Sequence, residues 1–300
     1  MDMHPGQLVV RISTVRRLVA EQFPAWRDLP VCAVTGPGTV NAIFRLGDVY
    51  AARFPMQSGD REAVRARLIA EAEAAEELHS STRVRTPRPV ALGEPGAGYP
   101  LPWSVQSWLS GTTADEEDLS GSEVFARDLA ALIRELRGVP TRGRIFAGDN
   151  RGGELRRDDA WVETCLARSE ALLDVPRLRR LWAALRELPR SAPDAMTHGD
   201  LVPGNVLVAG GRLVGLLDTG GFTAADPALD LVCAWHLLDT APRRILRVEL
   251  GSDHLEWSRG MAWAFEQALG LVWYYDVSNP AMSSLGRRTL TRILEAAPAV

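Results

Sequence analysis

The stretch His198-Gly199-Asp200-Leu201-Val202-Pro203-Gly204-Asn205 carries more information than any other part of the chain. It is followed by two short apolar runs, Val206–Val208 and Leu213–Leu217, and the second run leads directly into Asp218. A Gly-Gly pair separates the two runs, and this pattern predicts two strands joined by a tight turn. The hairpin would carry Asn205 at its entrance and Asp218 at its exit, where both side chains could face one ion.

The polar residues of this stretch are of the types that phosphoryl transfer from a nucleotide requires. Asp200 is the candidate base that orients an attacking hydroxyl and accepts its proton. Asn205 and Asp218 are the candidate Mg²⁺ ligands, because Mg²⁺ prefers one or two protein oxygens together with phosphate oxygens and water. The spacing H-G-D-x-x-x-x-N before a later Asp is the spacing of kinase sites. For His198, a hydrogen-bonded turn residue is the simpler interpretation and a direct chemical role is the alternative.

With Asp226-Pro227-Ala228-Leu229-Asp230-Leu231, these residues resemble the aminoglycoside phosphotransferase family of small-molecule kinases, most strongly over 197–238. The resemblance implies that Asp230 anchors the loop by hydrogen bonding. Gly199 stands where protein kinases place an Arg that clamps a phosphorylated activation loop, so we expect no such switch.

The resemblance implies an α+β fold of the bilobal, protein-kinase-like type. Its N-terminal, nucleotide-binding lobe would be a small antiparallel sheet with one helix, and its C-terminal lobe would be larger and mainly helical. The expected parts are an N-terminal lobe over 1–105 with its helix at 60–78, a hinge over 106–111, and a C-terminal lobe over 112–300 that contains the catalytic loop 198–205 and Asp218.

Composition limits the alternatives. The 300 residues are 46% hydrophobic, enough for a sizeable core, and the formal net charge of −4 argues against nucleic acid as the main partner. No apolar run approaches the roughly 18 residues that cross a membrane. The N-terminal residues lack the layout of a secretory signal, and the three cysteines (Cys32, Cys165 and Cys233) are far apart, as expected for reduced, largely buried thiols of a cytoplasmic protein. The oligomeric state is left open.

All 34 basic residues are arginine, and the chain has no lysine. Kinases of the resembled fold grip the α- and β-phosphates with a strand lysine paired to a helix glutamate. Three apolar segments, at 31–34, 42–46 and 49–55, predict strands, and Arg53 on the third stands at the position of that lysine. Arginine keeps the charge and adds a planar fork that suits phosphate oxygens; a solvated strand arginine is the alternative.

Three further segments complete the expected nucleotide site. The small-residue loop between the first two strands could approach phosphates with its backbone, although a plain turn is equally consistent with it. The helix at 60–78 has an apolar stripe, and Glu71 beside it is the candidate partner of Arg53, with Glu73 as the second choice. The resemblance places the base-binding hinge near the end of the last strand of the lobe. The loop candidates are Gly36, Gly38, Thr39 and Asn41, and the hinge candidates are Gln106, Ser107, Trp108 and Leu109.

The rest of the chain is predicted to be mainly helical, with helices over 122–137, 159–173, 175–188, 229–238, 257–275 and 285–296. Trp235, Trp263 and Trp273 on these helices are expected in the core. Acidic residues could bind a cationic acceptor, although a solvated loop is the simpler interpretation. These candidates are Asp115, Glu116, Glu117, Asp118, Asp149 and Asp159. The Gly-rich loop 143–153 could border the acceptor by its position.

The sequence therefore predicts a Mg²⁺-dependent kinase that moves the γ-phosphate of ATP or GTP to a hydroxyl of a small molecule. An aminoglycoside-like antibiotic is the leading acceptor, and resistance by inactivation would be the role. A macrolide, a peptide antibiotic, or a metabolite such as choline, homoserine or a sugar is an alternative within the same chemistry. A nucleotide-binding regulator with weak catalysis is the alternative that the missing lysine favours.

Overall fold

A computed structural model describes residues 7–34, 40–148, 151–190 and 192–297 of the chain. The chain divides into two compact units. The first comprises residues 1–110 with the short segment Asp218–Gly220, and the second comprises residues 111–217 and 221–300. The fold is α+β, as predicted, with a five-stranded antiparallel sheet in the first unit and most of the helices in the second.

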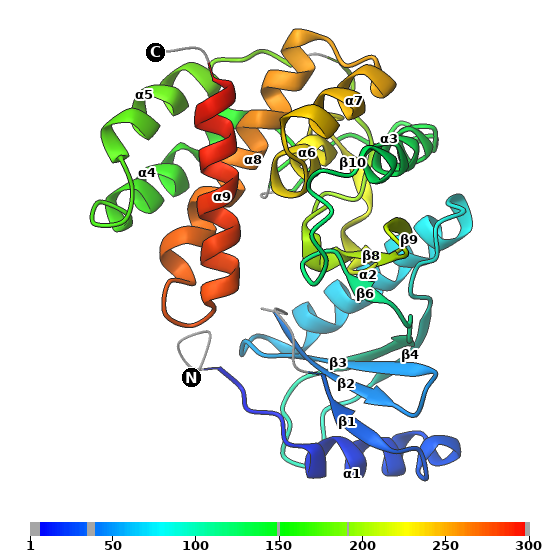
Figure 1. The fold of residues 1–300 in the computed structure, drawn as a ribbon. Coiled ribbons are helices and arrows are strands. Elements are labelled where there is room, and N and C mark those ends of the chain that lie inside the picture. Colours follow the sequence, from blue (N-terminus) through cyan, green and yellow to red (C-terminus); the bar gives the residue numbers. More distant parts are fainter. Residues whose placement is uncertain (1–6, 35–39, 149–150, 191, 298–300) are drawn as a thin grey trace. The chain divides into compact units, whose positions relative to one another are not determined.

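The first unit is built on an antiparallel sheet with the strand order β1-β2-β3-β5-β4 (Figure 1). The strands are β1 Val31–Ala33, β2 Asn41–Leu46, β3 Tyr50–Pro55, β4 Pro89–Gly93 and β5 Trp103–Ser107. A helix that the sequence did not predict, α1 Ile12–Gln22, packs against β1, and the 3₁₀ turn η1 Pro24–Trp26 follows it. Because β3 is central in the sheet, Arg53 projects from a strand that is paired on both sides.

Aromatic side chains make much of the core of this unit. The rings of Phe54 and Trp103 stack with their centroids 4.8 Å apart, and both side chains are fully buried. The Tyr99 hydroxyl donates a hydrogen bond of 2.8 Å to the Pro55 carbonyl, which ties the chain before β5 to the end of β3. This packing fixes the position of β3 within the sheet.

The predicted helix of the first unit is present as α2, Arg61–Ser81, which packs against β4 and β5. Asp60 caps it by accepting a hydrogen bond from the Ala63 backbone N–H, so the helix begins one residue after the predicted start. It continues three residues past the predicted end at Leu78. Leu68, Ala75 and Leu78 of the predicted stripe are buried.

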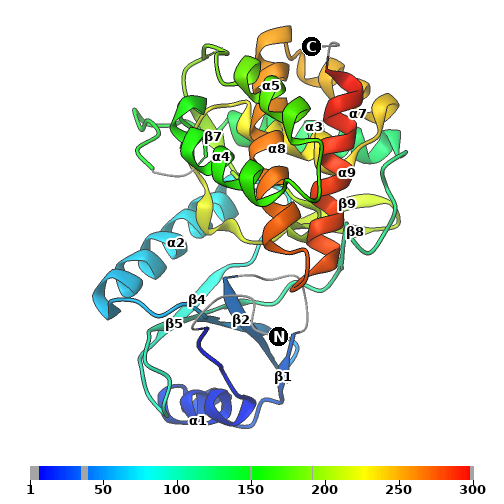
Figure 2. The same ribbon diagram turned by 90° about the vertical axis from the view of Figure 1, so that its left-hand side faces the viewer.

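The second unit contains most of the helices together with two small sheets, β6-β8-β9 and β10-β7 (Figure 2). Its helices are α3 Glu123–Arg137, α4 Asp159–Arg168, α5 Val175–Leu185, α6 Val232–Leu237, α7 Thr240–Leu250, α8 His254–Tyr274 and α9 Pro280–Ala296. Its strands are β6 Thr112–Thr113, β7 Ala195–Thr197, β8 Val206–Ala209, β9 Arg212–Leu216 and β10 Thr223–Ala225. Four 3₁₀ turns complete the element order, at η2 Leu155–Asp158, η3 Pro203–Asn205, η4 Thr219–Gly221 and η5 Leu229–Leu231.

The apolar helix α8 is the centre of the second unit, where it contacts α4, α5, α6 and α9. Arg259 of α8 and Asp226 form a fully buried ion pair with 2.6 Å between Nη2 and Oδ2. Trp263 Nε1 also donates to this carboxylate, and Arg259 donates to the carbonyls of Leu188 and Gly153. Since the two charges are paired and hydrogen-bonded, the cluster fastens two distant loops to the central helix.

Several expectations for this unit need correction. Helix α7 was not expected, and α4 ends at Arg168 and α5 at Leu185, earlier than predicted. Trp235 and Trp263 lie in the core, but Trp273 is partly exposed. Two of the three cysteines are buried, whereas Cys32 at the sheet edge is exposed. In the described part of the chain, no helix has the length and apolarity that a membrane span requires.

Candidate functional site

Asp230 anchors the loop that holds Asp200 by hydrogen bonds, as the resemblance implied. Asp230 is fully buried, and its two carboxylate oxygens accept the backbone N–H groups of His198 at 3.0 Å and of Gly199 at 2.9 Å. Burial raises the pKa of Asp230, whereas His198 and the two backbone N–H groups lower it. Gly199 has a φ of 82°, a conformation in which a side chain is disfavoured.

His198 is a buried structural member of this loop. Its Nε2 lies 2.9 Å from the Leu217 carbonyl, and its Nδ1 lies 3.3 Å from the Asp200 backbone N. The ring therefore donates a hydrogen bond at one nitrogen and accepts one at the other, so it joins the loop to the end of the hairpin. Both ring nitrogens are engaged within the protein, which favours the turn-residue interpretation.

The predicted hairpin is present, with Gly210 and Gly211 at its turn and both in the left-handed conformation. The hairpin entrance is closed by a backbone hydrogen bond of 2.8 Å from Leu217 to the Asn205 carbonyl. Its exit continues into Asp218. The turn glycines and the two apolar strands thus explain why Asn205 lies at the hairpin entrance.

Asp200 is held by three side chains. Asn205 Nδ2 donates to Oδ2 at 2.8 Å, and Gln267 Nε2 and Arg151 Nη2 approach Oδ1 at 2.5 Å and 3.3 Å. The Asp200 side chain is nevertheless 38% exposed, so a hydroxyl group could reach the carboxylate. A fixed and accessible carboxylate is what a general base needs.

Arg151 also faces a buried glutamate on α8. Its Nη1 lies 3.6 Å from Glu266 Oε2, and the Glu266 side chain is only 5% exposed. Burial raises the pKa of Glu266 to about 7, while the neighbouring Arg151 lowers it and Asp158 raises it further. Arg151 belongs to the Gly-rich loop that was predicted to border the acceptor, and it contacts Asp200.

Backbone contacts fix the position of this loop. The Gly152 carbonyl accepts the Asp226 N–H at 2.8 Å, and a Cβ on Gly152 would lie 2.9 Å from the Ala225 Cβ. With a φ of 121°, Gly152 also adopts a conformation that other residues avoid. The loop can pass close to β10 only because residue 152 is a glycine. This close approach brings the neighbouring Arg151 to Asp200.

Asp218, the second candidate metal ligand, lies in the short segment that belongs to the first unit. Its φ of 51° is in the left-handed region, which aspartate tolerates better than most residues, and its side chain is 51% exposed. Arg53 Nη2 contacts its Oδ1 at 2.7 Å, and Arg53 Nη1 lies 3.3 Å from Gln106 Oε1.

The expected ion pair between Arg53 and Glu71 is not formed. Both residues are within the described part of the chain, and the carboxylate that Arg53 contacts there is Asp218, whereas Glu71 Oε1 lies 3.5 Å from Arg67 Nε. Burial raises the pKa of Glu71, and the charge of Arg53 lowers it, so the two groups are still close enough to interact. The Arg53 guanidinium instead pairs with the Asp218 carboxylate.

A cavity of about 410 Å³ lies in the first unit beside α2 and strands β4 and β5. Arg53, Glu71 and Gly220 form part of its lining, together with apolar residues of both elements. Gly220 is packed against the helix: a Cβ added to it would lie 2.8 Å from the Glu71 Cβ. The segment 218–220 can thus approach α2 closely because Gly220 has no side chain.

The loop and hinge candidates have mixed outcomes. Gly36, Gly38 and Thr39 lie outside the described residues, and Asn41 is the first residue of β2. Gln106 and Ser107 are paired within the sheet, and the Trp108 N–H donates to the Val49 carbonyl at 2.7 Å. These backbone contacts lie within the sheet, and base binding by Gln106, Ser107, Trp108 or Leu109 stays a prediction.

The acidic residues proposed for the acceptor have mainly local roles. Glu116 accepts hydrogen bonds from the backbone and hydroxyl of Thr113, and Asp118 does the same for Ser120, while Asp115 and Glu117 line the same turn. Asp159 is paired with Arg186 and accepts a hydrogen bond from Trp182. Asp149 lies outside the described residues. These carboxylates stabilise turns and helix packing, which supports the simpler interpretation.

Gln267 and Glu266 were missed because the sequence pattern of α8 predicts a core helix. Two polar residues within the otherwise apolar stretch 260–274 of α8 were the available signal, since a polar side chain buried in a helix needs a partner. Only the packing of α8 indicates that the partners are Asp200 and Arg151.

A family model, described as the phosphotransferase enzyme family, matches residues 14–264. The chain belongs to this family. The matched part contains Arg53, the loop with Asp200, the hairpin and Asp218. The aminoglycoside phosphotransferase resemblance of the sequence is thereby confirmed.

Sequence identity to individual aminoglycoside phosphotransferases is low. An aminoglycoside 3′-phosphotransferase of Streptomyces fradiae is 32% identical over 181 residues, which cover 56% of this chain and 63% of the relative. One from Escherichia coli is 27% identical over 158 residues, 46% of this chain and 53% of the relative. The chain thus spans about half the length of the curated relatives it matches.

Solved structures of phosphotransferases share the fold over nearly the whole chain. The GDP complex of aminoglycoside 2′-phosphotransferase-IIIa has a TM-score of 0.69 at 18% identity, covering 96% of this chain and 100% of that one. A macrolide 2′-phosphotransferase of Brachybacterium faecium has a TM-score of 0.60 at 18% identity, covering 96% and 99%. At these identities, the likeness establishes the fold alone.

Proposed function

We propose that the protein transfers the γ-phosphate of ATP or GTP to a hydroxyl of a small molecule, with Asp200 as the base. The observation that carries the proposal is the environment of Asp200: its carboxylate is fixed by Asn205 and Gln267 and is 38% exposed. The attacking hydroxyl would donate its hydrogen bond to this carboxylate and pass its proton there as the bond to phosphorus forms.

The two candidate magnesium ligands offer suitable oxygens. The amide nitrogen of Asn205 is used on Asp200, which directs its carbonyl oxygen elsewhere. The Asp218 carboxylate is exposed and has one oxygen beyond the contact with Arg53. One amide and one carboxylate oxygen suit Mg²⁺, which takes its remaining ligands from phosphates and water. The ion would neutralise phosphate charge during transfer.

Arg53 is the candidate phosphate-binding cation. Its guanidinium has five donors, and the contacts with Asp218 and Gln106 use two of its nitrogens. An arginine on a central strand could therefore bind a phosphate while it remains near Asp218. Glu71 would act on it through charge at a distance rather than by direct pairing.

For the acceptor, we propose an aminoglycoside-like antibiotic, with inactivation of the drug as the role. Support comes from the names of the relatives, one of which is described in a complex with GDP and kanamycin. The acidic turn at 115–118 is not part of this proposal. Macrolides, peptide antibiotics, choline, homoserine and sugars stay as alternatives.

The test is an acceptor screen. The purified protein is incubated with Mg²⁺ and either ATP or GTP, together with kanamycin, gentamicin, streptomycin, a macrolide, a peptide antibiotic, choline, homoserine or glucose. Mass spectrometry then detects the gain of one phosphate. We expect phosphorylation of at least one aminoglycoside. Transfer to a metabolite alone would overturn the antibiotic assignment and keep the reaction.

One observation favours a second candidate, a nucleotide-binding regulator with weak catalysis. Arg53 contacts Asp218 at 2.7 Å, and a pair that stayed closed would hinder metal binding at Asp218, and so catalysis, while nucleotide binding persisted. Nucleotide binding by calorimetry, combined with Mg²⁺-dependent hydrolysis, separates the two. Tight nucleotide binding without hydrolysis or transfer to any acceptor would support the regulator.

A further inference from the structure

Gln267 of α8 contacts Asp200 from within the core of the second unit. Its side-chain nitrogen Nε2 lies 2.5 Å from Asp200 Oδ1, and the residue is only 7% exposed. Asn205 meets the other oxygen, Oδ2, at 2.8 Å. With one amide donor on each oxygen, the carboxylate plane is restrained against rotation.

A buried row of hydrogen bonds through His236 and Thr289 sets the orientation of the Gln267 amide. His236 Nε2 lies 3.0 Å from Gln267 Oε1, and His236 Nδ1 lies 2.9 Å from the Thr289 hydroxyl. Because an ionised carboxylate only accepts, Gln267 turns its NH₂ group to Asp200 and its carbonyl to His236. His236 must then carry its proton on Nε2 and accept the Thr289 hydroxyl at Nδ1. A single arrangement of protons satisfies every group.

The hydrogen-bonded residues His236 and Thr289 are shielded from solvent, so water does not compete for their hydrogen bonds. His236 is 2% exposed and Thr289 is fully buried. The pKa of His236 is lowered to about 4, chiefly by burial; the Gln267 hydrogen bond opposes this shift, and the charges of Arg151 and Arg292 act with it. The ring is therefore neutral at ordinary pH, and one of its nitrogens is free to accept.

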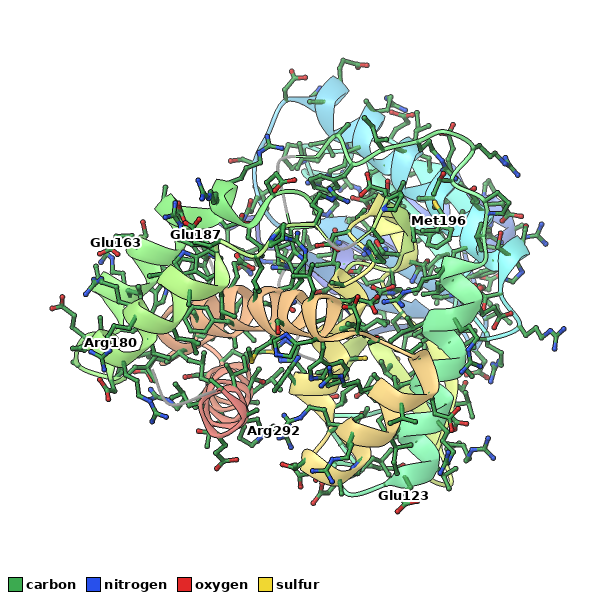
Figure 3. All side chains as sticks on the ribbon, turned by 90° about the horizontal axis from the view of Figure 1, so that it is seen from above. Glu123, Glu163, Arg180, Glu187, Met196 and Arg292 are labelled. Atoms are coloured by element: carbon green, nitrogen blue, oxygen red, sulfur yellow. The ribbon has the colours of Figure 1, made fainter. Side chains whose placement is uncertain are left out.

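The backbone around His236 is also held. Arg292 of α9, labelled in Figure 3, donates from Nη1 to the His236 carbonyl at 2.9 Å and to the Trp235 carbonyl at 3.2 Å. Its Nε and Nη2 contact Asp239 at 3.1 and 2.8 Å. Helices α6, α8 and α9 thus contribute one polar residue each to the chain that ends on Asp200.

We propose that Gln267 is the positioning residue of Asp200, and that His236 and Thr289 determine the direction of its amide. The inference rests on the proposed function, in which Asp200 receives the proton of the acceptor hydroxyl. Gln267 does not reach the reacting atoms; it acts by holding Oδ1 in one place. Loss of the amide would leave the Asp200 carboxyl group in place but in a variable orientation.

The first experiment replaces Gln267 with methionine, which keeps the length and apolar volume but removes the donor. We expect kcat to fall about 10- to 100-fold, the size of effect that misplacement of a reacting group produces, with little change in KM for the nucleotide. Gln22→Met is the matched control, because the Gln22 amide likewise bridges two elements but lies in the first unit. An unchanged kcat in Gln267→Met would overturn the role.

The second experiment tests the chain itself through Thr289. Thr289→Val removes the hydroxyl at nearly constant volume, and Thr289→Ser keeps it. We expect Thr289→Val to lower kcat about 3- to 10-fold, as the loss of one hydrogen bond in a network does, and Thr289→Ser to restore most of it. In the Gln267→Met background, Thr289→Val should add nothing. Full additivity would show that Thr289 acts independently of Gln267 and would overturn the proposed role of Thr289.

A third measurement does not depend on turnover. Nitrogen-15 NMR of the imidazole groups should find His236 with its proton on Nε2 between pH 5 and 8. A proton on Nδ1 would reverse the amide of Gln267 and overturn the proposal directly. If the wild-type protein phosphorylated no acceptor while this tautomer was present, the proposed function would fail and the hydrogen-bonded chain would stand.

Discussion

Asp200 lies on the loop before the hairpin and Asp218 follows the hairpin, and the two carboxylates are held in different ways. Asp200, in the second unit, accepts hydrogen bonds from Asn205, Gln267 and Arg151, and a buried chain fixes one of these donors. Asp218, grouped with the first unit, is 51% exposed, and within the described part of the chain its side chain pairs with Arg53 alone.

The difference matches the two tasks proposed for these carboxylates. A base must keep one orientation toward the reacting hydroxyl, so several fixed donors serve it. A metal ligand must keep an oxygen open for the ion, so an exposed carboxylate with a single ion pair suits it. The following substitutions test this contrast, in order of decreasing expected effect.

Asp200→Ala should produce the largest loss. Removing a general base lowers turnover by about 10²- to 10⁴-fold, and binding of the nucleotide should stay nearly normal. Turnover is measured with the best acceptor of the screen, and nucleotide affinity by calorimetry. Asp115→Ala, on an exposed turn, is the control. Near-normal turnover without the Asp200 carboxylate would contradict its assignment as the base.

Glu266→Gln tests whether the carboxyl beside Arg151 is as deeply buried as the structure indicates. Burial raises the pKa of Glu266 to about 7 in the folded protein. Between the unfolded pKa and pH 7, the folded state keeps a proton that the unfolded state releases, so stability falls as pH rises through this window. The wild type should lose on the order of 2–3 kcal/mol from this group between about pH 4.5 and 7.5.

The amide introduced by Glu266→Gln cannot ionise, so this slope should be missing from the unfolding curves of the variant. Denaturant titrations at pH 5, 6, 7 and 8 measure the slope. Glu163→Gln on the exposed surface of α4, where Figure 3 labels Glu163, serves as the control and should keep the slope of the wild type. Parallel curves for the wild type and Glu266→Gln would mean that this carboxyl is not buried as described.

Arg53→Ala tests the Asp218 side of the contrast. Loss of charge-assisted hydrogen bonds to phosphate should lower kcat/KM for the nucleotide about 10- to 100-fold. Arg45→Ala removes an arginine on β2 whose contacts are Asp48 and the ring of Trp108, and should change it less than about 2-fold, as expected for a surface charge. Equal effects would leave Asp200 as the base and remove Arg53 as the phosphate cation.

Gly220→Ala should have the smallest effect. The new Cβ would lie 2.8 Å from the Glu71 Cβ, so the Asp218 segment or α2 must shift, at a cost of about 1 kcal/mol or more. Nucleotide affinity should fall a few-fold, by an amount comparable to this cost. Gly121→Ala is the control, because nothing lies within 4 Å of its added Cβ. Identical stability of the two variants would show that the contact with α2 is loose.

The sequence predicted well wherever local patterns determine structure. The hairpin around Gly210 and Gly211, the helix that starts after Asp60 and the anchoring of the loop by Asp230 follow from turn residues, capping and family spacing. It missed α1 and α7, although both helices have an amphipathic pattern, and it made α4 too long, since α4 ends where Ser169 is buried. Helix boundaries depend on packing that a local pattern does not contain.

By itself, the sequence determined the family, the fold class and the residue types of the candidate site. The missing lysine, the H-G-D-x-x-x-x-N spacing and the aspartate after an apolar strand are local facts. Only the tertiary structure decided that Arg53 pairs with Asp218 instead of Glu71, and that Gln267 and His236 stand behind Asp200. These partners are far apart along the chain, and a hydrogen bond depends on distance in space, which only the packing of β3, α6 and α8 provides.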